Sequence, residues 1–289
     1  MTQDNPALAS PPVPSRSSTE GRGRTALVTG ASAGIGKELA LVFAAHHFDI
    51  VLVARRKERL DELASEIARK HGVRTHVMVA DLSDPATPRQ IFDEMVKQRI
   101  SVDALVNNAG FAVPGKFRDT QWEEQRQGIQ VMAVAVAELC HLFGPGMAAR
   151  GYGRILNVAS FAAFLPGVAG ATLYSACKAF VVKMSEAMAV EYQGKNVHVT
   201  ALCPGLTYSE FHDVAGNRKE MSRTPQILWM DAATVAREGY DSVMLGDVVW
   251  INGFINRILG VIARFLPRAF VSKLLQIDMG HDKPRQKAV

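Results

Sequence analysis

Length and charge bound this chain before any motif is considered. Its 289 residues are 48% hydrophobic, enough for the core of one large α/β domain. The net charge is +5, but residues 1–24 supply +1 of it and residues 279–289 supply +2, so the part between them is nearly neutral. A nucleic-acid-binding protein needs a basic stripe on a structured face, and the sequence predicts none. No uninterrupted apolar run approaches the ~20 residues that span a bilayer.

The two ends of the chain differ in composition from its middle. Residues 1–23 are rich in Pro, Ser, Thr and Gly, which predicts a disordered leader, and residues 279–289 are expected to form a flexible tail. Residues 24–278 form the predicted domain. The three cysteines are odd in number and lack metal-ligand spacing, so we expect no metal site and a cytoplasmic protein with reduced thiols.

Buried strands and helices alternate along the predicted domain. After a first strand at Thr25–Thr29, apolar runs suited to parallel strands recur at 50–53, 76–79, 104–106, 155–158, 197–202 and 248–251. Helical patterns lie between them at 57–70, 88–98, 133–149, 173–192 and 231–245. This alternation predicts a single α/β domain of Rossmann-like architecture, a doubly wound parallel sheet with helices on both faces. Ligands of such a sheet bind at the carboxyl ends of its strands.

A glycine-rich turn follows the first strand directly. The sequence Gly30-Ala-Ser-Ala-Gly34-Ile-Gly36 connects that strand to a helical pattern. Gly30 permits a tight turn, Gly34 lets the backbone approach a pyrophosphate, and Gly36 allows the helix to pack closely on the strand. The free N–H groups at the helix start then bind phosphate. Many connections between strand and helix carry glycines for backbone reasons alone, so the turn by itself leaves both interpretations open.

The end of the second strand bears on the choice of cofactor. In dinucleotide-binding folds an acidic residue there binds the ribose 2′-hydroxyl, whereas arginine suits a 2′-phosphate. Here Arg55 and Arg56 follow the strand, and the first acidic residue is Glu58. The sequence therefore favours NADP(H). The alternative is a solvated basic cluster, although positive charge at the start of a helix interacts unfavourably with the helix dipole.

A tyrosine and a lysine lie four residues apart in the helical pattern at 173–192. Tyr174 and Lys178 are expected on one helix face, and Ser160 precedes the tyrosine by 14 positions, just after a strand. A nearby lysine cation would lower the pKa of a tyrosine toward the range useful for proton transfer near neutral pH. Tyr-x-x-x-Lys also occurs by chance on helix surfaces, and a serine after a strand often only caps a turn. The catalytic interpretation of these three residues is strengthened by the other motifs of the sequence.

Five elements together resemble the short-chain dehydrogenase/reductase family, in its compact single-domain branch. They are the turn Thr29–Gly36, the run Asn107-Asn-Ala-Gly110, Ser160, the pair Tyr174-x-x-x-Lys178 and Pro204-Gly205, in the family's order and spacing over residues 24–250. The resemblance implies an oxidoreductase that transfers a hydride between a nicotinamide and a carbonyl or alcohol. It also implies a homodimer or homotetramer.

The resemblance also implies a set of site residues. Ser160, Tyr174 and Lys178 are the expected catalytic residues: the tyrosine exchanges the proton, the lysine shifts its pKa and holds the nicotinamide ribose, and the serine binds the substrate oxygen. The expected cofactor-binding residues are Gly30, Ser32, Gly34, Ile35, Gly36, Arg55, Arg56, Asp81, Asn107, Ala109, Gly110, Tyr174, Lys178, Pro204, Gly205, Thr207 and Ser209. Among these, Asp81 matches the family's adenine contact, and Ser209 stands where the family usually has threonine.

One position departs from the family. Many relatives carry an asparagine in the helix before Ser160, where it supports a water-mediated proton path to the lysine. Met132 stands at that place here, and no asparagine occurs between Asn108 and Asn157. A thioether accepts poorly and donates nothing. A second interpretation therefore stays open, a nucleotide-binding sensor or scaffold with little catalysis.

The remaining segments suggest the substrate and the surroundings of the site. Residues 161–173 carry no charge, and a substrate flap is expected at about 208–230 with further apolar side chains, so an apolar ketone, aldehyde or alcohol is the predicted substrate. Residues 254–276 alternate apolar and basic residues in a helical pattern. We expect this amphipathic segment to pack on the domain or at a subunit contact. A membrane-surface contact is the less favoured alternative.

Overall fold

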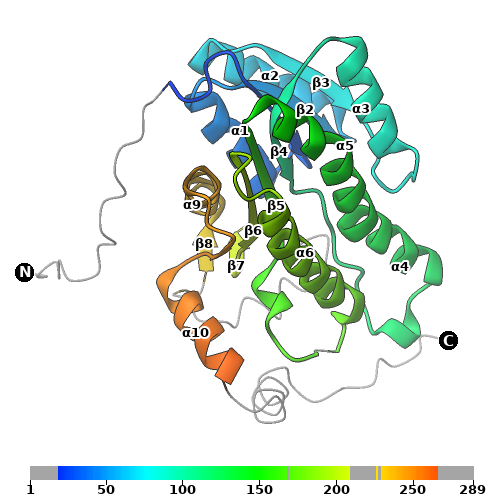
Figure 1. Cartoon of the computed structure of the whole chain (residues 1–289). Coiled ribbons are helices and arrows are strands. Elements are labelled where there is room, and N and C mark those ends of the chain that lie inside the picture. The colour runs from blue at the N-terminus through cyan, green and yellow to red at the C-terminus, as the bar shows by residue number, and fades with distance from the viewer. Residues whose placement is uncertain (1–18, 168, 209–225, 227–228, 266–289) are drawn as a thin grey trace, which may run out of the picture.

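The fold is a single parallel sheet covered by helices on both faces (Figure 1). The computed structural model describes residues 19–167, 169–208, 226 and 229–265. Within them the large sheet has the strand order β3-β2-β1-β4-β5-β6-β9, and every pairing is parallel. Its strands are β1 (Thr25–Thr29), β2 (Asp49–Ala54), β3 (Thr75–Val79), β4 (Val102–Asn107), β5 (Gly153–Val158), β6 (Val197–Cys203) and β9 (Val249–Ile251). The predicted fold class is confirmed.

The described helices connect these strands. They are α1 (Gly34–Ala45), α2 (Lys57–His71), α3 (Thr87–Lys97), α4 (Trp122–Ile129), α5 (Ala135–Arg150), α6 (Thr172–Glu191), α9 (Ala232–Leu245) and α10 (Phe254–Phe265). A π-helical turn, Gln130–Val134, joins α4 to α5. The helical pattern at 133–149 therefore predicted only the second half of a longer helix, Trp122–Arg150. Its first half, Trp122–Ile129, is mostly polar and buries only Gln125 and Gly128, so it carries little apolar periodicity.

That long helix belongs to the core. The run Trp122–Arg150 has 29 residues and is apolar enough by composition to cross a membrane. However, 56% of its most apolar window is buried inside the fold, as expected for a helix that packs in the core of a domain. Its length thus reflects packing on the sheet.

Two apolar cores lie on opposite faces of the sheet because successive side chains of a buried strand point in opposite directions. Ala26 and Val28 of β1 belong to the core beneath α1, α2 and α9, whereas Leu27 between them belongs to the core beneath α3, α5 and α6. Figure 1 shows α9 on one side of the sheet and α5 and α6 on the other. Burial on both faces explains why these strands are continuous apolar runs in the sequence.

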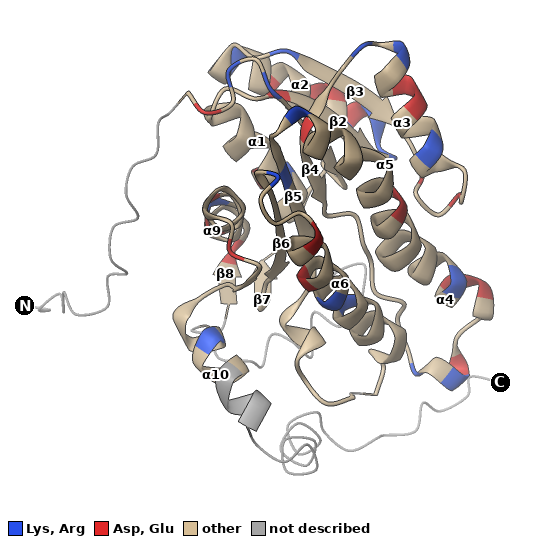
Figure 2. Ribbon diagram, viewed as in Figure 1, with Lys and Arg blue, Asp and Glu red and all other residues tan. Residues whose placement is uncertain are grey.

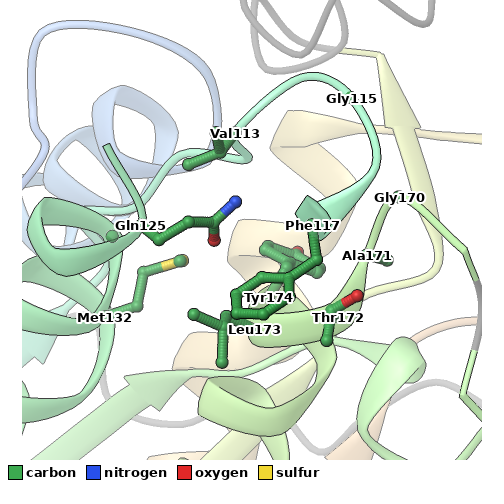
Figure 3. A pocket seen from close by; sticks show the side chains of 11 residues that line it. Val113, Gly115, Phe117, Gln125, Met132, Gly170, Ala171, Thr172, Leu173 and Tyr174 are labelled. Atoms are coloured by element: carbon green, nitrogen blue, oxygen red, sulfur yellow. The ribbon is translucent and has the colours of Figure 1, made fainter. Parts of the chain in front are cut away.

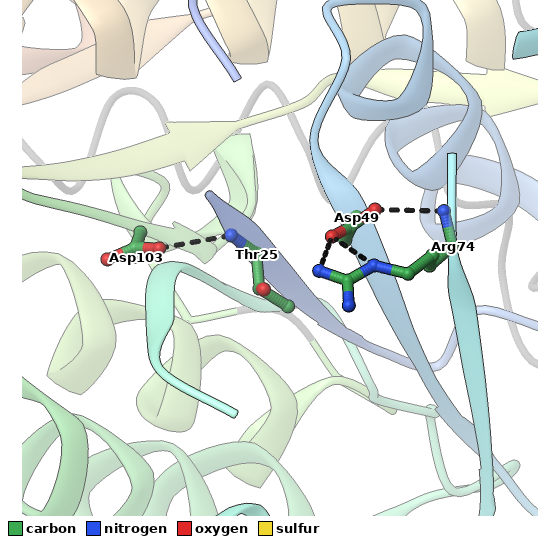
Figure 4. A network of polar contacts seen from close by, with 4 residues as sticks. All are labelled: Thr25, Asp49, Arg74 and Asp103. Carbon is green, nitrogen blue, oxygen red and sulfur yellow. Dashed lines mark hydrogen bonds and ion pairs between the residues drawn. The ribbon is translucent and has the colours of Figure 1, made fainter. Parts of the chain in front are cut away.

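Ionic and polar contacts tie the strands together at the edge opposite the glycine turn (Figure 4). Asp49, at the start of β2, accepts hydrogen bonds from the backbone N–H of Arg74 at 2.8 Å and from its guanidinium at 2.6 and 3.0 Å. Asp103 accepts a hydrogen bond of 3.0 Å from the backbone N–H of Thr25. These contacts hold β2 against the start of β3 and β1 against β4, and they leave the carboxyl ends of the strands to the ligand.

The predicted leader, residues 1–23, overlaps the described part of the chain at residues 19–23. Residues 19–23 form turns, and the backbone N–H of Gly21 donates to the carbonyl of His46 at 2.8 Å. A Cβ on Gly21 would lie 2.2 Å from the ring of Phe48, so this contact requires glycine. Residues 1–18 of the predicted leader and the predicted tail at 279–289 lie outside the described residues.

Charged side chains of both signs are interleaved on the outer helices. Figure 2 shows this mixture along α2 and α3. Several ion pairs within the described residues follow helical spacing, among them Lys57–Asp61 at 2.6 Å and Lys70–Glu66 at 2.6 Å. Such exposed pairs contribute little to stability individually.

Two short strands flank the segment predicted as a substrate flap. β7 (Leu206–Tyr208) pairs in parallel with β8 (Trp229–Asp231), and the rings of Tyr208 and Trp229 stack with centroids 4.7 Å apart. This pairing was not predicted from the sequence, because three-residue strands are too short for a periodic pattern. Between β7 and β8 only Gln226 is described, so the flap itself lies outside the described residues.

The described part of the C-terminal amphipathic segment packs on the domain. Asn256 of α10 is buried, and a Cβ on Gly205 would lie 2.4 Å from its side-chain nitrogen. Gly260 packs in the same way on Ile251 of β9, where a Cβ would lie 2.8 Å from Cδ1. These contacts agree with the expected packing helix as far as Gly260.

Candidate active site

The predicted site residues converge where the strand order reverses. β1 lies between β2 and β4, so the loops after β1 and β4 diverge to opposite faces and leave a crevice between them. The glycine turn follows β1, the Asn107–Gly110 run follows β4, Ser160 follows β5, and Pro204-Gly205 follows β6. These loops all leave the same edge of the sheet.

The glycine turn is held by a neighbouring asparagine. Asn108 donates from its side-chain nitrogen to the carbonyls of Thr29 at 3.0 Å and Gly30 at 3.3 Å. Gly30 has φ +66°. A Cβ on Gly36 would lie 2.3 Å both from that asparagine nitrogen and from the Gly30 carbonyl. Glycine at this position is therefore a steric requirement of the close packing between helix and turn.

The side chains of Asn107 and Asn108 make different contacts. The side chain of Asn107 is buried in the sheet, where its nitrogen donates to Asn157 Oδ1 at 2.9 Å and contacts Cys140 Sγ at 3.3 Å. Asn157 in turn donates to Ser185 of α6 at 2.9 Å. The side chain of Asn107 thus supports the floor of the site through its nitrogen. Asn108, which is not among the predicted site residues, makes the contact with the glycine turn.

The start of α1 suits a phosphate group. Its N-cap residue, Ala33, makes no side-chain capping bond, and its first turn contains no acidic residue. The N–H groups of that turn are therefore left without a side-chain acceptor at the positive end of the helix dipole. Together with Gly30 and Gly36, this opening fits a dinucleotide pyrophosphate.

Of the two arginines after β2, Arg56 contacts the glycine turn. Arg56 donates from Nε and Nη2 to Ser32 Oγ at 3.2 and 3.0 Å. Arg55 lies 3.8 Å from Asp81, which follows β3. Although burial raises the pKa of Asp81, hydrogen bonds from Ser83 and the Arg55 charge lower it overall. Ser32 and Arg56 thus form a hydrogen-bonded polar pair at the turn, and the lowered pKa keeps Asp81 ionised near Arg55.

Ser160, Tyr174 and Lys178 lie together at the ends of β5 and α6. The Lys178 ammonium is 5.8 Å from the centroid of the Tyr174 ring, so the predicted common face is confirmed. Lys178 is 5% exposed and donates to the carbonyl of Val158 at 2.8 Å. Burial lowers its pKa to about 8. Ser160 Oγ accepts a hydrogen bond of 3.2 Å from the backbone N–H of Ala162.

The pKa of the tyrosine moves opposite to the prediction. Burial raises the pKa of Tyr174, and a hydrogen bond with Ser160 only partly opposes this. The predicted lowering by Lys178 is wrong for this arrangement. The reason is geometric, since Lys178 lies near the ring of the tyrosine and donates to Val158. Ser160 is therefore the group that favours the phenolate here.

Met132 occupies the predicted place beside the lysine. The residue is 2% exposed and lies in the π-helical turn between α4 and α5. Its Cγ and the Lys178 ammonium lie 3.3 and 3.6 Å from the position that a Cβ on Gly110 would take. Met132 and Lys178 thus approach the same point beside Gly110, and the thioether offers no hydrogen-bond donor and only a weak acceptor there.

Tyr174 also lines a narrow pocket (Figure 3). Its lining residues are Val113, Gly115, Phe117, Gln125, Gly128, Met132, Gly170, Ala171, Thr172, Leu173 and Tyr174. The cavity volume is about 10 Å³, enough for one water molecule. A larger molecule enters only when part of the lining moves. The lining contains no charged residue, which suits an apolar molecule.

The loop after β6 completes this edge. The carbonyl of Pro204 accepts a hydrogen bond of 2.8 Å from the backbone N–H of Phe161, which ties this loop to the one that carries Ser160. Thr207 is buried, and its hydroxyl donates to the carbonyl of Gly205 at 3.1 Å. Ser209, which is also among the predicted cofactor-binding residues, lies outside the described residues.

Comparison with known proteins agrees with this geometry. The model of the short chain dehydrogenase family matches residues 24–220, more than half of the chain. The chain belongs to the short-chain dehydrogenase family. It therefore belongs to a family of oxidoreductases, and the resemblance stated from its motifs is confirmed.

Relatives of this short-chain dehydrogenase include several named reductases. The chain is 32% identical over 262 residues to a very-long-chain 3-oxoacyl-CoA reductase of Phaeosphaeria nodorum, covering 86% of this chain and 76% of that protein. A short-chain dehydrogenase from Sphingobium yanoikuyae in complex with NADPH has a TM-score of 0.75 and 29% identity, covering 92% of this chain and 98% of that one. A 7beta-hydroxysteroid dehydrogenase structure has a TM-score of 0.78 and 26% identity, with coverages of 89% and 98%.

Proposed function

We propose that this protein is an NADP(H)-dependent oxidoreductase that interconverts an apolar ketone or aldehyde and the corresponding alcohol. The observation that carries the proposal is the grouping of Ser160, Tyr174 and Lys178 beside an uncharged pocket. A phenol, a hydroxyl and a buried ammonium at one point are groups that bind a carbonyl oxygen and exchange a proton with it.

Each side chain has a separate task in the proposed reaction. A bound nicotinamide supplies the hydride for reduction and accepts it in oxidation. The Tyr174 hydroxyl gives its proton to the substrate oxygen in reduction and takes it back in oxidation. Ser160, which hydrogen-bonds Tyr174, holds the substrate oxygen and favours the phenolate. Lys178, held by its hydrogen bond to the carbonyl of Val158, binds the nicotinamide ribose.

The proposed preference for NADP(H) rests on Arg55, Arg56 and Ser32. The two hydrogen bonds between Arg56 and Ser32 place a guanidinium beside the glycine turn, where it can pair with a 2′-phosphate. Asp81 faces Arg55 at 3.8 Å, so its carboxylate is partly offset by that cation. The NADPH complex of the relative from Sphingobium yanoikuyae supports the same choice.

The proposed substrate class rests on the pocket lining. Val113, Phe117, Met132 and Leu173 present apolar surface to the space beside Tyr174. An organic acid would require a cation there, and the lining has none. The names of the relatives, a very-long-chain 3-oxoacyl-CoA reductase and a 7beta-hydroxysteroid dehydrogenase, agree with an apolar carbonyl or alcohol.

Substitution of the tyrosine tests the proposal. Tyr174→Phe removes one hydroxyl and should abolish NADPH-dependent reduction across a panel of apolar ketones and aldehydes. Its affinity for NADPH, measured by calorimetry, should stay within a few-fold. Tyr152→Phe is the matched control, because Tyr152 lies near Arg24 and Arg154, away from the pocket. A Tyr174→Phe protein with full activity would refute the assignment of the proton donor.

The alternative of a nucleotide-binding sensor makes a different prediction. It requires tight NADPH binding and no turnover of any carbonyl or alcohol by the unmodified protein. The comparisons do not favour it, because the named relatives include reductases and dehydrogenases. The same substrate panel separates the two functions.

We also propose a cytoplasmic homodimer or homotetramer. The three cysteines are buried and free, which agrees with a reducing compartment. Trp122 of α4 and Phe180 of α6 are exposed apolar side chains that a subunit contact would cover. Light scattering after size-exclusion chromatography gives the subunit number, and a monomer at all concentrations would refute the assembly.

A further inference from the structure

One polar side chain in the pocket has no part in the proposed reaction. Gln125 of α4 is 7% exposed and lines the pocket together with Phe117, Met132 and Leu173. Figure 3 shows its carboxamide extended into the pocket, toward Phe117 and Tyr174. A carboxamide among apolar side chains, deprived of most of its water, favours any ligand that satisfies its hydrogen-bonding groups.

The orientation of this carboxamide follows from its hydrogen bonds. The hydroxyl of Thr120 donates its only proton to the carbonyl of Phe117 at 3.0 Å. The Thr120 oxygen therefore acts as an acceptor toward Gln125, and Nε2 of Gln125 donates to it at 2.8 Å. With the nitrogen fixed on Thr120, the carbonyl oxygen Oε1 takes the other position of the amide.

That carbonyl oxygen remains available to a ligand. Within the part of the chain that the structure describes, the side chain of Gln125 makes this one hydrogen bond, through its nitrogen. Oε1 has no hydrogen-bond partner among the described residues and is not sealed from solvent, so a ligand can reach it. The pocket thus offers a fixed hydrogen-bond acceptor in a lining without charged residues.

We infer that Gln125 Oε1 accepts a hydrogen bond from a second polar group of the substrate, apart from the carbonyl or alcohol that reacts at Tyr174. Because Oε1 only accepts, that group is a hydrogen-bond donor, a hydroxyl or an amide N–H. The preferred substrates are then apolar carbonyl compounds that carry such a donor along their skeleton. This inference rests on the proposed function and narrows its substrate class.

A set of matched ketones tests the inference. An aliphatic methyl ketone is compared with hydroxy ketones of the same chain length, whose hydroxyl moves outward one carbon at a time. The unmodified protein should reduce at least one hydroxy ketone with a kcat/KM at least ~10-fold above that of the plain ketone. Gln125→Leu, which keeps the approximate size and removes the acceptor, should abolish this preference, so that the hydroxy ketones and the plain ketone are reduced with similar kcat/KM.

A second variant separates recognition from a merely structural role. Thr120→Val removes the anchor of the amide nitrogen but keeps the Gln125 carbonyl, so part of the preference should remain. If Gln125 served only to tie α4 to the Phe117 turn, both variants would lose activity on all ketones equally. That result would overturn the inference, as would a preference that persists in Gln125→Leu.

Failure of the proposed function is distinguishable from failure of this inference. If the unmodified protein turns over no ketone, binding of the same compounds with NADPH present is measured by calorimetry. Tighter binding of a hydroxy ketone than of the plain ketone, lost in Gln125→Leu, would support donor recognition even without turnover. Equal binding of the two would overturn it.

Discussion

The buried ammonium of Lys178 should make the stability of this protein depend on pH. Its pKa is lowered from 10.5 to about 8, chiefly by burial. At pH values between these two, the unfolded chain holds a proton that the folded protein has released. Stability therefore rises with pH across this window, and the unfavourable contribution of the charge is fully present below about pH 8.

The size of the effect follows from the two pKa values. A lowering from 10.5 to about 8 corresponds to roughly 3 kcal/mol of destabilisation at neutral pH. Roughly 2 kcal/mol of this should disappear between about pH 7 and about pH 9.5. Lys178→Met removes the titrating group and keeps the length of the side chain. The difference in unfolding free energy between the unmodified protein and this variant should change by that amount, in favour of the unmodified protein.

Urea denaturation at a series of pH values measures this difference. Groups that titrate in this range away from Lys178 are common to both proteins and cancel in the comparison. Cys177 and Cys203 do not cancel, because the Lys178 charge lowers their pKa values, so each is also replaced by serine in both proteins. Lys183→Met is the matched control, because Lys183 lies on the same helix with 80% of its side chain exposed. A difference for Lys178→Met that stays constant over this range would refute the conclusion that burial penalises the ammonium.

Three further results are expected. NADPH should bind at least ~10-fold tighter than NADH in calorimetry, and replacing Arg55 and Arg56 with alanine should erase the difference; tighter NADH binding to the unmodified protein would exclude the 2′-phosphate site. Met132→Asn should raise kcat for carbonyl reduction and expose a hydride isotope effect, at a cost of ~1–3 kcal/mol in stability if the new amide finds no partner. A well-folded variant with unchanged kinetics would mean that another route serves the proton. Gly36→Ala should abolish cofactor binding or folding, since its Cβ would lie 2.3 Å from backbone, whereas Gly128→Ala, whose nearest contact is 3.6 Å, should be tolerated on both measures.

The sequence by itself determined the fold class and the position of the site. Alternating apolar runs and helical patterns specify a parallel sheet, because a strand buried on both faces must be apolar throughout. The site followed from the same rule, since motifs placed just after strands must meet at one edge of such a sheet. The common face of Tyr174 and Lys178 was predictable too, because helical spacing alone sets it.

Tertiary structure decided which group each side chain contacts. Asn107 and Asn108 are neighbours in the sequence, yet the first pairs with Asn157 inside the sheet and the second holds the glycine turn. The choice depends on strand register and on which face each residue takes, and neither is written in local composition. The raised pKa of Tyr174 likewise comes from burial by distant segments.

The same reason explains what the sequence did not reveal about the pocket. Gln125 lies in a polar stretch with little periodicity, and its role depends on Thr120 and Phe117, which fix the direction of its amide. The pairing of β7 with β8 joins segments 21 or more residues apart in the chain. Local propensities determine elements, whereas the partners of a buried polar group are set by contacts that form only when those elements pack together.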